Sequence, residues 1–295
     1  MTEASLRPAG DAAGMPRALA RIVGIARRSP TAAIGMAILT GFAGLAVFAP
    51  LVMPYDPIAA FPREILTAPN SEFWLGTDGN GMDVFSRVIY GARYAFGIAI
   101  PAVILSIVIG VPLGLWTGYV GGYVDEVTMR VFDALRVFPS IILALAVVAA
   151  TGQSLVNVVL VIGVLDSPIF ARVVRSEVLA LRSSTFVESA IAAGNPTRRI
   201  LFVHLLPNAI QGAMAQTAVR AAWAVRISAT LAFLGVGIQA PTPEWGAMIR
   251  QGAEFMVTGQ WWVALFPGIA LILMVLGLNM LGDGLQDLLN PRRKA

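Results

Sequence analysis

Residues 31–53 read TAAIGMAILTGFAGLAVFAPLVM and contain no charged side chain. The hydrocarbon core of a bilayer is about 30 Å thick, and about 20 residues of apolar helix cross it. The stretch is long enough to do so and predicts a transmembrane helix. We expect this helix to be retained rather than removed as a signal peptide, because its apolar run is long and a long basic segment precedes it.

Five more apolar stretches follow, and together they predict an all-α integral membrane protein with six transmembrane helices. The expected spans after the first are 95–118, 131–151, 154–171, 209–237 and 262–281. Arg136 and Pro139 interrupt the third span, and Asp166 interrupts the fourth. In the second span, Gly110, Gly114, Gly118 and Gly122 recur at four-residue spacing, which favours close helix packing over a gating role.

Composition agrees with a membrane protein and excludes several chemistries. The chain is 57% hydrophobic and 13% charged, whereas soluble domains carry nearer a quarter charged residues. It has no cysteine, one histidine (His204) and one lysine (Lys294). Thiolate and multi-histidine metal sites are therefore excluded, as is a P-loop, whose glycines precede a lysine. We expect no catalytic residue, metal or cofactor on this chain, and any use of ATP and Mg²⁺ to occur in partner ATPases.

The distribution of positive charge predicts the orientation, because arginine and lysine are enriched in cytoplasmic segments. With both termini in the cytoplasm, the inside segments hold 15 basic residues and the outside segments hold four. The net charge of +4 is thus an orientation signal, and nucleic acid is not an expected partner. Tryptophan rings favour the membrane surface, and four of them fall at or near the expected outer surface. These are Trp74, Trp245, Trp261 and Trp262.

The expected cytoplasmic segment 177–208 carries the most local information. Thr185 and Glu188 have capping-box spacing, which predicts a short helix beginning at Thr185. Gly194 is a natural helix terminator, and Asn195-Pro196 is typical of the start of a second helix. Pro207-Asn208 predicts a break before the fifth span. The second short helix would lie along the cytoplasmic face, where apolar residues next to arginines suit docking to another protein.

The motif ESAIAAG, residues 188–194, followed by nine residues and HLLP, resembles the EAA motif of ABC importer permeases. That motif reads Glu-Ala-Ala, three residues, Gly, nine residues, a hydrophobic position, any residue and Leu-Pro. The matching residues are Glu188, Ala190, Gly194, Leu206 and Pro207. Ser189 replaces an alanine, and His204 stands where an aliphatic residue is usual, although His-x-Leu-Pro-Asn is familiar in the peptide-importer branch.

Three other stretches resemble the dipeptide and oligopeptide (peptide/nickel) branch, in the subunit type usually lettered C. They are LGTDGNGMDVFSRVIYGAR (75–93), LAFLGVGIQAPTPEWGAMI (231–249) and LGDGLQDLLNPR (281–292). In the first stretch, Met82 replaces the usual arginine. The resemblance covers residues 30–292 and implies a type I importer permease (MetI-like) core with an extra N-terminal helix.

The implied organisation is a cytoplasmic tail (1–30), a first transmembrane helix (31–53), a periplasmic segment (54–92), a core of five transmembrane helices (93–290) containing the loop 177–208, and a tail (291–295). The subunit would form half of an inner-membrane pore for peptides or similar small solutes. The implied partners are a homologous second permease, two cytoplasmic ATP-binding subunits, membrane lipid and a periplasmic binding protein that delivers cargo to 54–92 and 238–261.

The resemblance also implies which residues couple the pore to the ATPases, with residues 196–203 as the coupling helix. They are Glu188, Ala190, Gly194, Asn195, Pro196, Arg198, Arg199, His204, Leu206 and Pro207. Simpler roles exist for some of them. Glu188 as a helix cap alone is one alternative, and His204 is better read as a structural polar residue than as a proton relay. Gly194 is a turn residue in any reading.

Three charges lie deep within the spans: Asp166, Arg220 and Arg226. Intramembrane charges face a bundle interior or an aqueous path and find partners. Helical rise places Asp166 and Arg220 at similar depth, so we expect them to pair or to line the pore; a purely structural salt bridge is the alternative. An ion-coupled secondary transporter is the main rival function, but the chain shows no convincing repeat, and Asp166 is the one acid deep within a span.

Overall fold

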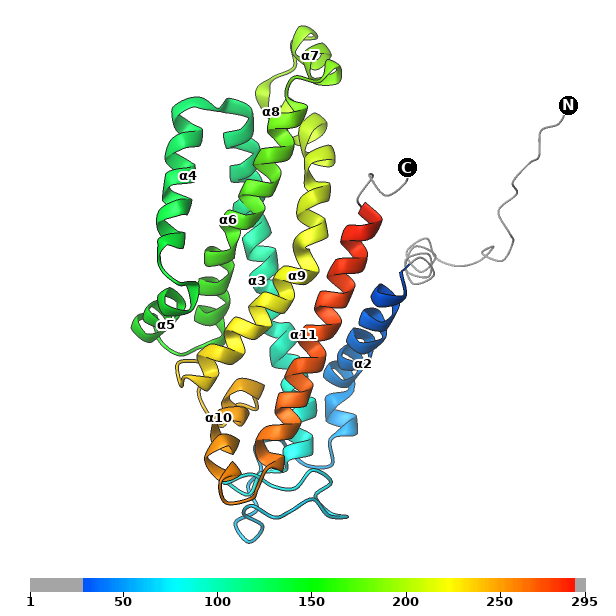
Figure 1. The fold of residues 1–295 in the computed structure, drawn as a ribbon, viewed down its shortest axis with the longest axis vertical. Helices are drawn as coiled ribbons and strands as arrows, with labels where there is room; N and C mark the ends of the chain where they lie inside the picture. Colours follow the sequence, from blue (N-terminus) through cyan, green and yellow to red (C-terminus); the bar gives the residue numbers. More distant parts are fainter. Residues whose placement is uncertain (1–28, 290–295) are drawn as a thin grey trace, which may run out of the picture.

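The computed structural model describes residues 29–289, which fold into a bundle of helices (Figure 1). The helices are α2 (Pro30–Val52), α3 (Val84–Val120), α4 (Gly122–Val137), α5 (Ser140–Thr151), α6 (Leu155–Leu181), α7 (Thr185–Ala192), α8 (Thr197–Arg199), the π-helical segment η1 (Ile200–Leu205), α9 (Leu206–Phe233), α10 (Trp245–Met256) and α11 (Trp262–Leu289). This part of the chain contains no β-strand, so the predicted all-α class is confirmed. The predicted tails, 1–30 and 291–295, lie almost entirely outside the described residues.

Four of these helices, α2, α3, α6 and α11, are long and apolar enough to cross a membrane one by one. The predicted third span, 131–151, is wrong as a single helix. It corresponds to α4 and α5, which are bent by 87° at a short break. Pro139 accounts for the break, because proline lacks an N–H and forces the preceding Phe138 into extended backbone. The predicted fifth span corresponds to α9, which is 28 residues long but less apolar, since it carries two arginines.

The second crossing begins earlier than predicted, at Val84 rather than near residue 95. Asp83 caps the helix by accepting a hydrogen bond from the Ser86 amide at 2.8 Å. With 37 residues, α3 is about 55 Å long and extends well beyond a bilayer core. Its polar first turn is therefore part of the structure outside the membrane.

The glycine repeat on α3 packs against α6, as its spacing predicted. A methyl group at Gly114 would overlap the Ala171 carbonyl oxygen, and one at Gly118 would lie 2.9 Å from the Cβ of Val178. Gly110 meets the Ser167 carbonyl in the same way. Gly122 does not belong to this face. It starts α4 with φ +59°, and a methyl group there would meet nothing within 4 Å.

The elements sort to the two ends of the bundle (Figure 1). Helices α7 and α8 lie at one end, and the start of α2 and the end of α11 point toward it. We call this the α7 end. Helix α10 and residues 54–83 lie at the opposite end, which we call the α10 end. The segments expected on one side of the membrane thus share one end of the molecule.

At the α10 end, Arg87 joins two outer segments that are far apart in the sequence. Its side chain is 2% exposed, and its Nε lies 3.4 Å from the Asp78 carboxylate. Its Nη1 donates hydrogen bonds to the carbonyl oxygens of Pro57 (3.0 Å) and Pro241 (3.2 Å). A buried arginine needs such partners, and here they tie the 54–83 segment to the loop before α10.

Two of the four tryptophans differ from their predicted surface role. Trp245 and Trp262 are buried, at 2% and 7% exposure. Their indole N–H groups donate to the carbonyl oxygens of Val88 and Thr77. Both therefore hold the α10 end together by packing, whereas Trp74 and Trp261 are exposed.

Candidate coupling segment and intramembrane charges

The segment after α6 begins with α7, at the residue that the sequence predicted but with a different cap. The N-cap residue is Ser184, and no side chain caps α7. The Ser184 hydroxyl donates instead to the Leu181 carbonyl at 2.6 Å. Glu188 is exposed, and its carboxylate makes no hydrogen bond or ion pair within the described residues. The capping-box prediction is therefore wrong, and the Glu188 carboxylate is free to meet another molecule.

A tight turn ends α7 at Gly194. Gly194 has φ +74° and donates its N–H to the Ile191 carbonyl at 2.9 Å, while the Asn195 N–H reaches the Ala190 carbonyl at 3.1 Å. These two bonds form a Schellman motif, which requires a left-handed residue at the glycine position. The Asn195 side-chain amide donates to the same Ala190 carbonyl at 2.9 Å. The turn therefore fixes the direction in which the chain leaves α7.

The chain is continuously helical from Thr197 to Phe233, and the predicted break at Pro207 is wrong. Pro196 is the N-cap of α8, which leads through η1 into α9 without an interruption. Pro207 lies at the start of α9, directly after η1, where the hydrogen-bond pattern changes from π-helical to α-helical. Asn208 donates its side-chain amide to the His204 carbonyl at 2.9 Å. The expected short second helix is thus the end of a long helix that enters the bundle.

Apolar side chains fix this segment to the bundle. Val187 of α7 and Ile200, Leu201 and Leu205 of η1 are buried, with exposures from 0% to 3%. They join a core cluster with residues of α3 and α6. The α3 and α6 members of this cluster include Val111, Leu115, Phe170, Val174 and Val178. A force on the α7–α8 turn is therefore transmitted to packed helices rather than to a free loop.

The opposite surface of this segment is exposed and partly apolar. Phe186, Ile191, Phe202 and Val203 are 39–57% exposed. Arg198, Arg199, Glu188, Gly194, Pro196 and Pro207 are exposed as well, whereas Asn195, His204 and Leu206 are half-buried and Ala190 is buried. The predicted coupling residues thus occupy one segment, but Ala190 supports its inner side. Exposed apolar groups next to charges are typical of an interaction surface.

Asp166 of α6 and Arg220 of α9 lie side by side within the bundle. Their Oδ1 and Nη1 atoms are 3.2 Å apart, and the two side chains are 3% and 19% exposed. The structure thus brings these two residues together, as their depths suggested. Arg226 lies six residues further along α9, is exposed and does not take part in this pair.

A polar hollow of about 200 Å³ adjoins this ion pair at the break between α4 and α5. Its polar lining consists of Arg136, Ser140, Asp166, Arg220 and Trp223. Arg136 was predicted only as an interruption of the third span and not as a neighbour of Asp166. Arg136 lies shortly before a proline in a helix of low apolarity, and this was the sequence signal that could have indicated a polar site there.

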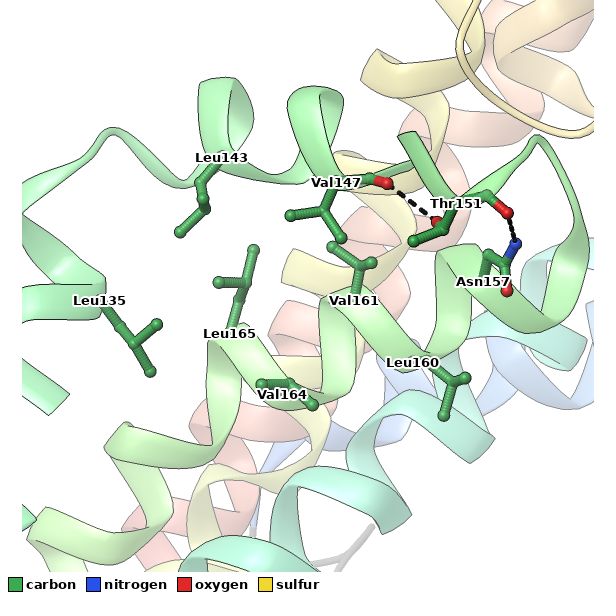
Figure 2. A pocket seen from close by; sticks show the side chains of 9 residues that line it. All are labelled: Leu135, Leu143, Val147, Thr151, Asn157, Leu160, Val161, Val164 and Leu165. Carbon is green, nitrogen blue, oxygen red and sulfur yellow. Dashed lines mark hydrogen bonds between the residues drawn. The ribbon is translucent and has the colours of Figure 1, made fainter. Parts of the chain in front are cut away.

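A second hollow, of about 310 Å³, lies between α5 and α6 and is almost wholly apolar (Figure 2). It is lined by Leu135, Leu143, Val147, Thr151, Asn157, Leu160, Val161, Val164 and Leu165. Figure 2 shows leucine and valine side chains facing one another across it, and a hydrogen bond of 2.9 Å from Asn157 to the Thr151 carbonyl at one end. This hollow suits apolar groups and has no charged group to hold an ionic one.

Two further ion pairs connect α4 to α6. Arg175 contacts Asp125 at 2.5 Å and donates two hydrogen bonds to it, and Arg172 contacts Asp133 at 2.6 Å. Sequence reasoning counted these arginines only as orientation signals. Their acidic partners are 39 and 50 residues away, so the pairing becomes visible only when α4 and α6 are side by side.

Comparison with known proteins agrees with this geometry. Residues 110–295 match the family described as binding-protein-dependent transport system inner membrane component. Residues 24–69 match the N-terminal TM domain of oligopeptide transport permease C. The fold resembles a chain of the inward-facing MetNI methionine ABC transporter, with a TM-score of 0.55 and 20% identity, over 69% of this chain and 96% of that one. The last likeness supports the MetI-like fold with an extra N-terminal helix.

Two relatives are similar over most of their length. The dipeptide transport system permease protein DppC of Alkalihalophilus pseudofirmus is 41% identical over 91% of this chain and 88% of the relative. The glutathione transport system permease protein GsiD of Pectobacterium atrosepticum is 40% identical over 91% of this chain and 89% of the relative. Both are named as permeases rather than enzymes.

The multi-pass helical bundle and these matches define an inner-membrane permease of an ATP-driven importer. More particularly, the chain belongs to the peptide/nickel family of ABC importer permeases, with the N-terminal domain of the C-type subunit.

Proposed function

We propose that this permease forms one half of a translocation pore that imports peptides or similar small solutes. The names of the relatives, which specify dipeptide and glutathione, support this cargo class. The other half of the pore would be a homologous second permease. Two cytoplasmic subunits would bind and hydrolyse ATP with Mg²⁺, since this chain has a single lysine at position 294 and so no P-loop.

The α7 end would face the cytoplasm, with both termini on that side. The excess of arginine in the segments at this end supports the orientation. The outer segments 54–92 and 238–261 would then receive cargo from a periplasmic binding protein. Arg87 bonds to both segments, so a protein bound to either one acts on α3 directly.

The observation that carries the proposal is the helix that runs without a break from Thr197 to Phe233. One of its ends carries the exposed Arg198 and Arg199, and its interior carries Arg220, which is paired with Asp166. Movement of an ATPase bound to the α7–α8 segment would therefore displace the intramembrane ion pair. Such coupling requires different contacts in the two states of the pore.

Reconstitution tests the energy source. The permease pair, the ATPases and the binding protein are placed in proteoliposomes, and uptake of radiolabelled alanyl-alanine and glutathione is measured with ATP or with an imposed ion gradient. We expect uptake with ATP and none with a proton or sodium gradient alone. Uptake driven by a gradient without ATP would instead identify an ion-coupled secondary transporter.

A further inference from the structure

We propose that the polar hollow at the α4–α5 break is a binding site for a carboxylate group of the cargo as it passes through the pore. This inference rests on the proposed function, because it assigns a chemical preference to the path of that cargo. The hollow contains two guanidinium groups, Arg136 and Arg220, and one carboxylate, Asp166. Its formal charge is therefore +1, and one more anionic group would neutralise it.

The three charges line one hollow and therefore lie close together at the α4–α5 break. A charged side chain within a membrane bundle avoids lipid and faces water or a partner group. The Arg136 side chain is exposed in this subunit and forms no ion pair or hydrogen bond with residues 29–289. The open side of the hollow is therefore better suited to an aqueous path than to acyl chains.

Two features besides Arg136 add positive potential at the hollow. The Nε of Arg220 is buried and has no hydrogen-bond partner in the described structure, because Asp166 accepts only from Nη1. The N-terminus of α5 also borders the hollow through Phe138, Pro139 and Ser140, and no side chain caps this helix. An uncapped helix N-terminus adds partial positive charge to that of the guanidinium groups.

A carboxylate fits this set of groups better than a cation or a neutral amide does. Arginine binds carboxylate through charge-assisted hydrogen bonds, and often through two at once. The neighbouring apolar hollow shares Leu135 and Leu165 with the polar one but lacks charge. A solute with a carboxylate and an apolar side chain would find both kinds of surface next to each other.

The test exploits the absence of cysteine from the chain. The Ser140→Cys variant places a single thiol of this chain at the hollow in the assembled importer. Its rates of reaction with anionic sulfonatoethyl and cationic trimethylammonioethyl methanethiosulfonates are measured by mass spectrometry of this subunit. We expect the anionic reagent to react about tenfold faster, relative to a thiol in water, because the local potential is positive.

Added substitutions identify the source of the selectivity. Arg136→Gln should remove most of the preference for the anionic reagent, whereas Arg136→Lys should retain it. Arg130→Gln is the matched control, since Arg130 is an exposed arginine of the same helix whose partner is Glu126. Alanyl-alanine should slow the labelling reaction, and its C-terminal amide should not.

Several results would overturn the inference. They are a thiol unreactive toward both reagents, a charge preference unchanged by Arg136→Gln, and equal protection by the dipeptide and its amide. The first of these would mean that lipid or the second permease covers the hollow. Labelling requires neither ATP nor uptake, so a charge-selective hollow in a complex without ATP-driven uptake would refute the proposed function and leave the site standing.

Discussion

The contact between α3 and α6 depends on glycine, and alanine at Gly114 should weaken it. The added methyl group would lie 3.0 Å from the Ala171 Cα and overlap the Ala171 carbonyl oxygen. Non-bonded carbon atoms favour separations of about 3.5–4.0 Å, so the helices must move apart locally by about 0.5–1 Å. Overpacking of this kind typically costs ~1–3 kcal/mol.

The matched control is Gly97→Ala, in the same helix, where a methyl group meets nothing within 4 Å. Both substitutions gain the same helix propensity, about 1 kcal/mol, so their difference isolates the packing term. We expect Gly114→Ala to unfold about 2–12 °C below Gly97→Ala, from roughly 2–4 °C per kcal/mol for domains near this size. Thermal unfolding in detergent, followed by tryptophan fluorescence, measures it. Equal unfolding temperatures would refute the close packing of α3 on α6.

Three further predictions concern charges and surfaces. Burial raises the pKa of the Glu244 carboxyl, which lies outside the spanning helices, to about 7. The contribution of this carboxyl to the free energy of unfolding should therefore be greatest below about pH 4.5 and fall by about 3 kcal/mol as the pH rises to 7. Glu244→Gln should remove this pH dependence in unfolding titrations. An unchanged pH dependence in the variant would contradict the raised pKa. Asp166→Asn should lower the free energy of unfolding by about 3 kcal/mol in the same assay. The double variant with Arg220→Gln should lose less than the sum of the two single losses. Additive losses would rule out the pairing. A Phe202→Cys variant should cross-link to an ATPase subunit on gels, whereas Val257→Cys, 94% exposed at the α10 end, should not; the reverse pattern would invert the proposed orientation.

The strongest signals in the sequence were long uninterrupted apolar runs and small residues at regular spacing. The charge-free run at 31–53 predicted α2 to within one residue at each end, because no polar group competed with the lipid signal. The glycines at 110, 114 and 118 predicted close packing, because glycines four residues apart share one face of a helix. Such patterns need no knowledge of which element lies opposite.

Local polar signals were less reliable where neighbouring structure decides the outcome. Thr185 and Glu188 have capping-box spacing, but Ser184 precedes the helix and bonds back to α6 instead. Pro207 was expected to break the helix, but it follows a π-helical turn, where the hydrogen-bond pattern already changes, and the helix continues through it. Both outcomes depend on the chain geometry just upstream of the motif.

Long-range polar partners were partly predictable. The pairing of Asp166 and Arg220 was predictable from their depth alone, because opposite charges within a bilayer are stabilised by pairing with each other. Arg136 was missed as a third member, since its proximity follows from the bend at Pro139 and not from the sequence of either helix. Arg87 was correctly placed in an outer segment, but its burial in the protein was not predicted, because its carbonyl partners lie 30 and 154 residues away in the sequence.

ATP-driven uptake by a permease with an altered α7–α8 turn tests the central account most directly. Glu188→Ala with Gly194→Val removes a free carboxylate and forces a β-branched residue to φ +74°, where a side chain would meet nothing within 4 Å. Gly122→Val is the control, with φ +59° and equally open space at the start of α4, outside the α7–α8 turn. We expect the double variant to insert normally and to lose at least about tenfold in uptake rate, while the control transports at near the wild-type rate. Uptake at the normal rate by the double variant would show that no motor acts on the pore through this turn.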